Sequence, residues 1–239
     1  MLQHVNISGG NMGPLLFSIC HATARVPVGW RPSYEHWTAM CDDPLTVEYI
    51  LSVHESDFVH IAPVVPVGVR LVDYANAMRK CSVDNWNNAA KHSTGKIIIL
   101  NADDFFAPAH WDTLLLEGLF DVGKALTDEF AIRVAVGHPS HDNRPNKLMT
   151  LGIMSRALYE RWGYALYPEY ESMASDDDFT EHAFQDGVVI EMMHLTFEHR
   201  HHVFGKSRED NVYRHQNRQE AYTIGDRILA ERRVRRFAS

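Results

Sequence analysis

The most constraining feature of this sequence is a short apolar run that ends abruptly in acidic residues. Ile97-Ile98-Ile99-Leu100 follows Lys96 and is followed directly by Asn101-Ala102-Asp103-Asp104. A run this short and this rich in β-branched residues is typical of a strand that is buried on both faces. Two carboxylates beside such a strand are costly near a core unless a cation or a helix terminus meets them. The pattern therefore predicts a sheet with charged chemistry at the carboxyl end of one strand.

Further apolar runs alternate with helical patterns along the chain, which is typical of α/β proteins. We expect strands over residues 15–20, 47–53, 69–74, 96–100 and 130–136, and a further apolar run over 149–154. Helices are expected over 33–40, where Ser33 would be the cap, and over 86–92, 108–122 and 156–162, the last stopped by Gly163. The order predicts a mostly parallel sheet flanked by helices on both faces, with ligands beyond the carboxyl ends of its strands.

Composition narrows the class of protein. The chain has 239 residues, 45% hydrophobic and 23% charged, as expected for one soluble globular domain over 1–239. Its 23 Lys and Arg against 31 Asp and Glu give a net charge of −8, which argues against sequence-blind binding to nucleic acid. No apolar run approaches the roughly 20 residues needed to cross a bilayer, and the N-terminal residues lack an export pattern, so we expect a cytoplasmic protein, in the host cytoplasm if it is viral.

The cysteines and the C-terminal arginines have simple interpretations. Cys20, Cys41 and Cys81 are too widely spaced for a disulfide framework or a metal knuckle, so we expect buried thiols. The C-terminal residues form a local basic patch, which we interpret as a solvated helix face: Arg227, Arg232, Arg233, Arg235 and Arg236.

The acidic turn belongs to a longer stretch that resembles a known family. Residues 87–95, Asn-Asn-Ala-Ala-Lys-His-Ser-Thr-Gly, followed by the strand and Asn101-Ala102-Asp103-Asp104, are similar to the central part of GT-A-fold glycosyltransferases of the family-2 type. The resemblance covers about residues 14–213. It implies that Asp103 matches the metal-binding aspartate of the DxD motif, which joins Mn²⁺ or Mg²⁺ to the diphosphate of a nucleotide sugar. From spacing alone, Asp103 and Asp104 could equally begin and cap the next turn.

The resemblance also implies which residues contact the donor nucleotide. Asn101 stands where the family usually has its first aspartate, so an amide replaces the carboxylate that contacts the ribose or the metal in that family. The residues expected around the nucleotide sugar are His21, Thr23, Arg25, Glu55, Asp57, Asn76, Asn87, Asn101, Asp104 and Lys206.

A second acidic cluster, Ser175-Asp176-Asp177-Asp178, precedes a helical pattern that ends near Gly187. Carboxylates at a helix N-terminus favour the helix dipole, and capping alone could explain them. Three in a row exceed that need, and mutual repulsion would raise at least one pKa toward the range of a general base. The family resemblance implies that Asp176 is the base that deprotonates the acceptor, with Asp177 as the alternative register and Ser175 in place of the family's Glu.

A third cluster contains four histidines within nine positions, His194, His199, His201 and His202. In a strand, His199 and His201 would lie on one face and could ligate one cation. Many GT-A enzymes use a C-terminal histidine as an additional metal ligand; we favour His201, with His199 second. An ordinary surface cluster is the alternative, and Lys206 is equally open to binding the diphosphate or facing solvent.

Together these features favour a metal-dependent glycosyltransferase, either a hexosyl- or a pentosyltransferase, that inverts configuration at the transferred sugar. Residues 14–105 would bind the nucleotide sugar, residues 106–213 would hold the acceptor and the base, and 214–239 would form a basic helical segment. UDP is the expected nucleotide; the acceptor could be a saccharide, an envelope precursor or, in a phage-like relative, a hydroxymethylated DNA base. A sugar-nucleotide nucleotidyltransferase is disfavoured because the loop at 25–31 has no glycine cluster, and a non-catalytic nucleotide- or metal-binding module remains an alternative.

Overall fold

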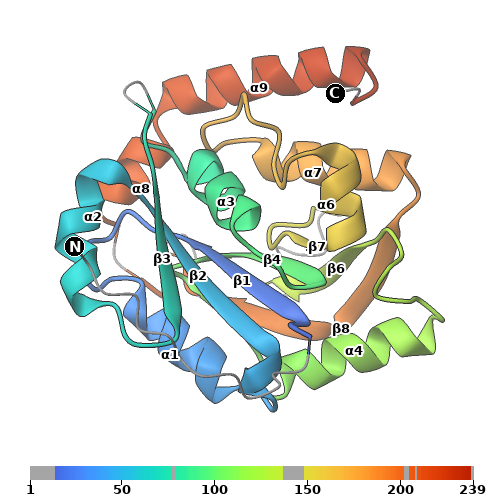
Figure 1. Ribbon diagram of the computed structural model, residues 1–239. Coiled ribbons are helices and arrows are strands. Elements are labelled where there is room, and N and C mark those ends of the chain that lie inside the picture. The colour runs from blue at the N-terminus through green and yellow to red at the C-terminus, as the bar shows by residue number, and fades with distance from the viewer. Residues whose placement is uncertain (1–13, 77–78, 137–147, 202–204, 208, 238–239) are drawn as a thin grey trace.

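The computed structural model describes residues 14–76, 79–136, 148–201, 205–207 and 209–237. In this part of the chain a curled, eight-stranded mixed sheet lies between two layers of helices (Figure 1), with the strand order β3-β2-β1-β4-β7-β6-β8-β5. The strands are β1 (Phe17–Ala22), β2 (Val47–His54), β3 (Val69–Tyr74), β4 (Ile97–Ala102), β5 (Phe105–Phe106), β6 (Ala131–Val136), β7 (Ile153–Ser155) and β8 (Val189–His199). The expected α/β architecture, with helices on both faces, is confirmed.

The helices follow the strands in the expected alternation. They are α1 (Arg31–Ala39), α2 (Glu55–Ile61), α3 (Ser82–Lys91), α4 (Trp111–Asp121), α6 (Arg156–Trp162), α7 (Ser175–Gln185), α8 (Asn211–Gln216) and α9 (Gln219–Val234), with short 3₁₀ turns at Pro44–Thr46 and Ala62–Val64. Figure 1 shows α1 and α4 on one face of the sheet, α3, α6 and α7 on the other, and α9 across the outside of the second layer. None of the helices in the described ranges is both long and apolar enough to span a membrane.

Four neighbouring strands, β3, β2, β1 and β4, run parallel, so their carboxyl ends meet at one edge. In this register Ala22 of β1 lies between Ser52 of β2 and Ala102 of β4. Beyond β4 the direction changes: β7 pairs antiparallel with both β4 and β6, β6 and β8 are parallel, and β5 and β8 are antiparallel. The turn that carries Asp103 and Asp104 therefore opens where the sheet changes direction.

Strand β4 is buried on both faces, as its sequence predicts. Ile97 and Ile99 pack in a core with Trp37 of α1 and Trp111 of α4. Ile98 and Leu100 point to the opposite side and pack in a second core that includes residues of α3, α6, α7 and α9. Because successive side chains alternate across a strand, one apolar run fills both cores.

Several expectations need correction. Helix α1 begins at Arg31 with Trp30 as its N-cap, so Ser33 is not the cap; Pro32 fits the first turn, where its missing N–H costs nothing. Ser33 instead donates to the Phe105 carbonyl at 2.9 Å. Cys20 is buried, whereas Cys41 and Cys81 are only half-buried.

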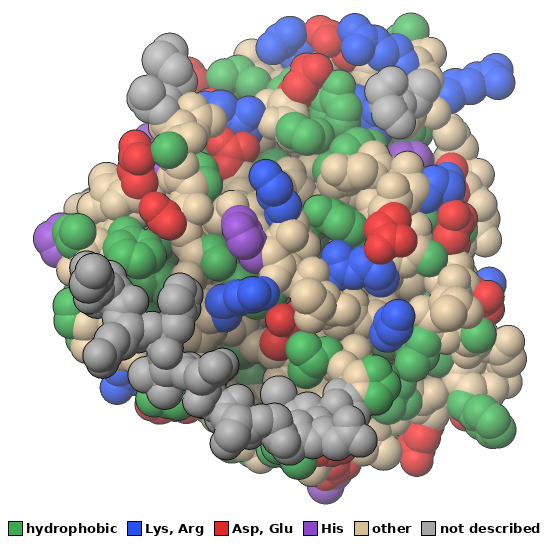
Figure 2. Space-filling view, in the orientation of Figure 1, with side chains coloured by type: hydrophobic (Ala, Val, Ile, Leu, Met, Phe, Trp, Pro, Cys, Tyr) green, Lys and Arg blue, Asp and Glu red, His purple; other side chains and the backbone are tan. Residues whose placement is uncertain are grey.

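The basic C-terminal segment also differs from its interpretation as a solvated face. Arg227, Arg233, Arg235 and Arg236 are exposed, and Figure 2 shows Lys and Arg side chains gathered along the edge where α9 lies. Arg232, however, is only 1% exposed. Its partner is a carboxylate of the second acidic cluster.

Candidate active site

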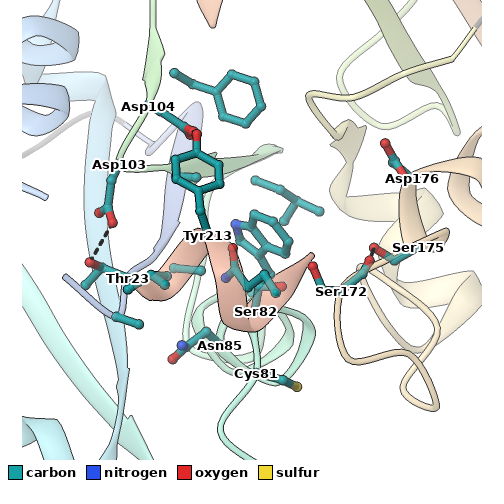
Figure 3. Close-up of a pocket in the computed structure, with 18 of the residues that line it drawn as sticks. Thr23, Cys81, Ser82, Asn85, Asp103, Asp104, Ser172, Ser175, Asp176 and Tyr213 are labelled. Atoms are coloured by element: carbon teal, nitrogen blue, oxygen red, sulfur yellow. Dashed lines mark hydrogen bonds between the residues drawn. The ribbon is translucent and has the colours of Figure 1, made fainter. Parts of the chain in front are cut away.

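A cavity of about 590 Å³ opens at the carboxyl ends of β1 and β4 (Figure 3). Its wall comes from the loop after β1, the first turns of α3, the turn after β4, residues 149–152, the segment that leads into α7, the end of β8, and α8. Parallel strands bring the first of these elements together, because their carboxyl ends share one edge.

Asp103 lies on the β1 side of this cavity and is held through both of its carboxylate oxygens. His21 Nε2 lies 2.9 Å from Oδ1, while Thr23 Oγ1 and Arg25 Nη1 each donate to Oδ2 at 3.0 Å. Arg25 also donates from Nε to Asp210 at 2.7 Å. Although burial alone would lower it, the pKa of Arg25 is raised by the hydrogen bonds and charges of these two carboxylates. A permanently charged guanidinium therefore stands beside Asp103.

Asp104 is the carboxylate that meets the C-terminal histidines. Its Oδ2 lies 3.3 Å from His199 Nε2 and accepts a 2.5 Å hydrogen bond from the Tyr213 hydroxyl. The His201 ring is centred 5.0 Å from that of His199 and 4.4 Å from that of Tyr213. Burial alone would raise the pKa of Asp104, but the hydrogen bonds of His199 and Tyr213 and the charge of Arg25 outweigh it and hold that pKa well below its usual range.

Asp103, Asp104 and His199 are the groups at this edge of the cavity that could hold a divalent cation. In the described ranges no three His, Cys, Asp or Glu side chains are arranged around a common metal position. Mg²⁺, however, commonly binds through one or two carboxylates and fills its shell with phosphates and water.

The first two residues of the second acidic cluster, Ser175 and Asp176, line the same cavity from the other side. Figure 3 shows Asp176, in the first turn of α7, across the cavity from Asp103 and Asp104. No side chain caps α7; its N-cap is Ala174, in the left-handed region at φ 64°. The backbone N–H of Asp177 donates to Asp176 Oδ1 at 3.1 Å. Asp176 lines the cavity and Asp177 is absent from its wall.

The third aspartate of this cluster, Asp178, is turned away from the cavity into the core. Arg232 Nε donates to its Oδ2 at 2.9 Å, and both side chains are 2% exposed. Burial raises the pKa of Asp178, and the hydrogen bond and charge of Arg232 counteract only part of that rise. The expected pKa increase in this cluster is thus present at Asp178, but its main cause is burial rather than repulsion between neighbours.

Other predicted site residues lie away from the cavity wall. Glu55 is exposed at the start of α2, and Asp57 is buried and lies 2.7 Å from Lys80 Nζ. Asn76 donates to Asp84, and Asn87 binds the backbone of residues 165–166. Lys206 is exposed and 2.9 Å from Glu198.

The remaining histidines and aromatics are placed as follows. His194 is exposed on β8, and His202 lies outside the described residues. The aromatic side chains at the end of α6 and in the segment after it pack into the core: Trp162, Tyr164 and Tyr170 are each at most 8% exposed.

Comparisons with known proteins place the fold. The sequence matches no protein-family model, and no curated protein matches it significantly. Solved structures are similar. One of them is the mannosyltransferase PcManGT from Pyrobaculum calidifontis in complex with GDP-Man and Mn²⁺. It matches this chain with a TM-score of 0.57 at 15% identity, over 92% of this chain and 75% of the PcManGT chain. TarS of S. aureus matches 76% of this chain with a TM-score of 0.54 at 13% identity. TarS 1–349 in complex with UDP-GlcNAc matches 90% of this chain, also with a TM-score of 0.54 at 13% identity.

This chain spans 36% of the length of the TarS structure and 71% of TarS 1–349 with UDP-GlcNAc. At such low identity the similarity concerns the fold. The chain therefore has a GT-A-like, Rossmann-type fold, which is also the fold of these glycosyltransferase structures.

Proposed function

We propose that this protein is a metal-dependent glycosyltransferase that moves a sugar from a nucleoside-diphosphate donor to an acceptor hydroxyl. The observation that carries the proposal is the composition of one cavity: an acidic pair with imidazoles on one side and an unburied carboxylate on the other. The structural neighbours include complexes with UDP-GlcNAc and with GDP-Man and Mn²⁺, which supports the choice of donor class. UDP is the donor nucleotide we expect.

The acidic side of the cavity would hold Mn²⁺ or Mg²⁺ and the diphosphate. Asp103, Asp104 and His199 would hold the cation, with His201 beside them. When bound, such a cation neutralises the charge that develops on the departing nucleoside diphosphate. Arg25 stands next to Asp103 and can place a fixed positive charge on a phosphate oxygen, because its guanidinium stays protonated.

The opposite side of the cavity would activate the acceptor. Asp176 would accept the proton of the acceptor hydroxyl as that oxygen attacks the anomeric carbon. A base on the face opposite the leaving group implies inversion of configuration, and the positions of Asp176 and the acidic pair across the cavity support this order. We assign residues 14–105 to donor binding and residues 106–213 to the acceptor and the base. A saccharide, an envelope precursor or a hydroxymethylated DNA base remains the proposed acceptor.

The test is turnover of a panel of nucleotide sugars, including hydrolysis in the absence of acceptor, with Mn²⁺, with Mg²⁺ and with EDTA. We expect activity only with a divalent ion, and its loss in Asp103→Ala and Asp104→Asn. Asp176→Asn should retain nucleotide binding by calorimetry but lose transfer. The neighbouring Asp177→Asn is the matched control, because it removes a carboxylate that does not line the cavity. Full activity with EDTA or in Asp103→Ala would contradict the proposal, and nucleotide binding without any turnover would favour a non-catalytic module.

A further inference from the structure

Asn85, in α3, is a polar side chain in the cavity wall whose amide nitrogen has no hydrogen-bond acceptor among the residues that the structure describes. It is 4% exposed and lines the cavity (Figure 3). Its Oδ1 accepts a hydrogen bond from the Ser52 hydroxyl at 3.2 Å. In the described part of the chain, no group accepts a hydrogen bond from its Nδ2. This nitrogen is accessible from the cavity, because it is not among the buried side-chain atoms that lack a partner in the described residues, so ordered water or a ligand in the cavity can accept its hydrogen bonds.

The orientation of this amide is fixed by a chain of hydrogen bonds that starts at a backbone carbonyl. The carbonyl of Asp73 can only accept, so the Asn88 atom 3.2 Å from it is the amide nitrogen. The same nitrogen donates to Ser52 Oγ at 3.0 Å. The Ser52 hydroxyl has one proton, and the only acceptor for it among the described residues is Asn85 Oδ1. Asn85 therefore presents its two N–H groups to the cavity and cannot present its oxygen.

The position of Asn85 indicates which part of a donor it would meet. Ser52, its partner, lies beside Ala22, and Ala22 lies beside Ala102, the residue before Asp103. At about 4.8 Å between neighbouring strands, Ser52 is about 10 Å from the start of the acidic pair, on the β2 side. Figure 3 shows Asp176 across the cavity from that pair, in a different direction from Asn85. A nucleotide sugar with its diphosphate at Asp103 and Asp104 and its sugar toward Asp176 would extend its nucleoside toward Asn85.

We propose that Asn85 determines nucleobase specificity, by donating a hydrogen bond to the keto oxygen that distinguishes uracil from cytosine and guanine from adenine. The inference rests on the proposed function. A hydrogen-bond donor of fixed orientation can discriminate only between groups that always accept and groups that always donate a hydrogen bond. A keto oxygen always accepts, whereas the amino group at the corresponding position of the other base donates. Ribose hydroxyls do both, so they would gain nothing from the hydrogen-bond chain that holds Asn85 in place.

The test is calorimetric titration of the full chain with UDP, CDP, GDP and ADP in the presence of Mn²⁺. Wild-type protein should bind UDP more tightly than CDP, or GDP more tightly than ADP, by about tenfold or more. The reason is that the amino group of cytosine or adenine would point its N–H donors at the N–H donors of Asn85. Asn85→Asp places an acceptor at the same point and should reverse the preference. Asn85→Ala should bring the ratio close to one.

Asn211→Asp is the matched control, because it adds the same charge at another asparagine of the cavity wall; it should weaken all four nucleotides and leave the ratios unchanged. Equal affinities within both wild-type pairs overturn the inference even if a variant fails to fold. Ratios that stay the same in Asn85→Asp and Asn85→Ala overturn it as well. Wild-type protein that binds none of the four nucleotides would instead refute the proposed function.

Discussion

The buried ion pair between α7 and α9 leads to a prediction for Arg232→Met. Asp178 and Arg232 are each 2% exposed at their side chains and are joined by a 2.9 Å hydrogen bond. Removing one partner of such a pair leaves an uncompensated buried charge, which costs about 3–5 kcal/mol. Arg232 also donates to the Tyr164 hydroxyl at 2.8 Å and lies 3.9 Å over the Tyr167 ring. We therefore expect a loss near the upper end of that range.

The loss should depend on pH, with a definite sign. Burial raises the folded-state pKa of Asp178, and Arg232 opposes part of that rise, so the variant should have a still higher folded-state pKa. A carboxyl whose pKa is higher in the folded than in the unfolded state costs stability as pH rises through the folded-state value. The deficit of Arg232→Met relative to the wild type should therefore be full at pH 8 and shrink as pH falls toward the ordinary range of aspartate.

The assay is urea unfolding of both proteins at several pH values. Arg233→Met is the matched control: Arg233 is the next residue of α9, but its bond to Glu181 is exposed, so we expect at most about 1 kcal/mol. The double variant Asp178→Leu with Arg232→Met should recover part of the loss, because no charge is then buried unpaired. A loss in Arg232→Met no greater than in Arg233→Met, or one that does not change with pH, would refute the reasoning.

Two further changes probe the same part of the molecule. Gly225→Ala in α9 would place its Cβ 2.4 Å from the Met173 carbonyl oxygen, so we expect urea unfolding to show about 1–3 kcal/mol of destabilisation. The control is Gly118→Ala in α4, whose Cβ would meet the flexible end of Met192 and should cost less. Equal losses in the two variants would contradict this expectation. His182, stacked 4.0 Å from Trp162, has its pKa lowered to about 4, chiefly by burial. A protein whose histidine has a depressed folded-state pKa loses stability as pH falls from about 6.5 to about 4, so His182→Phe should flatten the fall in melting temperature over that range.

Much of the fold could be predicted from the sequence because the decisive signals are local. The run before Asp103 is short, apolar and β-branched, and it forms a strand that is buried on both faces. Helix α6 begins and ends as predicted, because Gly163 adopts the left-handed conformation that ends a helix. The start of α1 was predicted wrongly because Ser33 has the chemistry of a cap, but its hydroxyl bonds to a carbonyl far along the chain.

The candidate site shows where local patterns stop being informative. The family resemblance implied a metal-binding C-terminal histidine, with His201 favoured over His199; the structure places His199 beside Asp104, and its metal role stays a prediction. The sequence did not single out Arg232 or Asn85. An arginine in a basic helix is usually solvated, and its contact with Asp178, 54 positions away, depends on how α9 packs on α7. Asn85 is one of three asparagines in α3, and only the register of β2 against that helix gives it a partner in Ser52.

The departure at Asn101 from the family's acidic motif has a physical explanation in the core. Asn101 is 0% exposed and does not line the cavity. Its amide nitrogen lies 3.0 Å from His21 Nδ1, 3.0 Å from Ser33 Oγ and 3.1 Å from Tyr49 Oη. An ionised aspartate here would be buried with no full positive charge in contact, at a cost that its neutral neighbours could not offset. An amide fills the same space without a charge, with only its neutral Oδ1 left without a hydrogen-bond partner among the described residues, so the negative charge at the end of β4 resides on Asp103 and Asp104. The carboxylates at the end of β4 are therefore those of Asp103 and Asp104, and substitutions at Asn101 should act through the packing of His21 beneath Asp103.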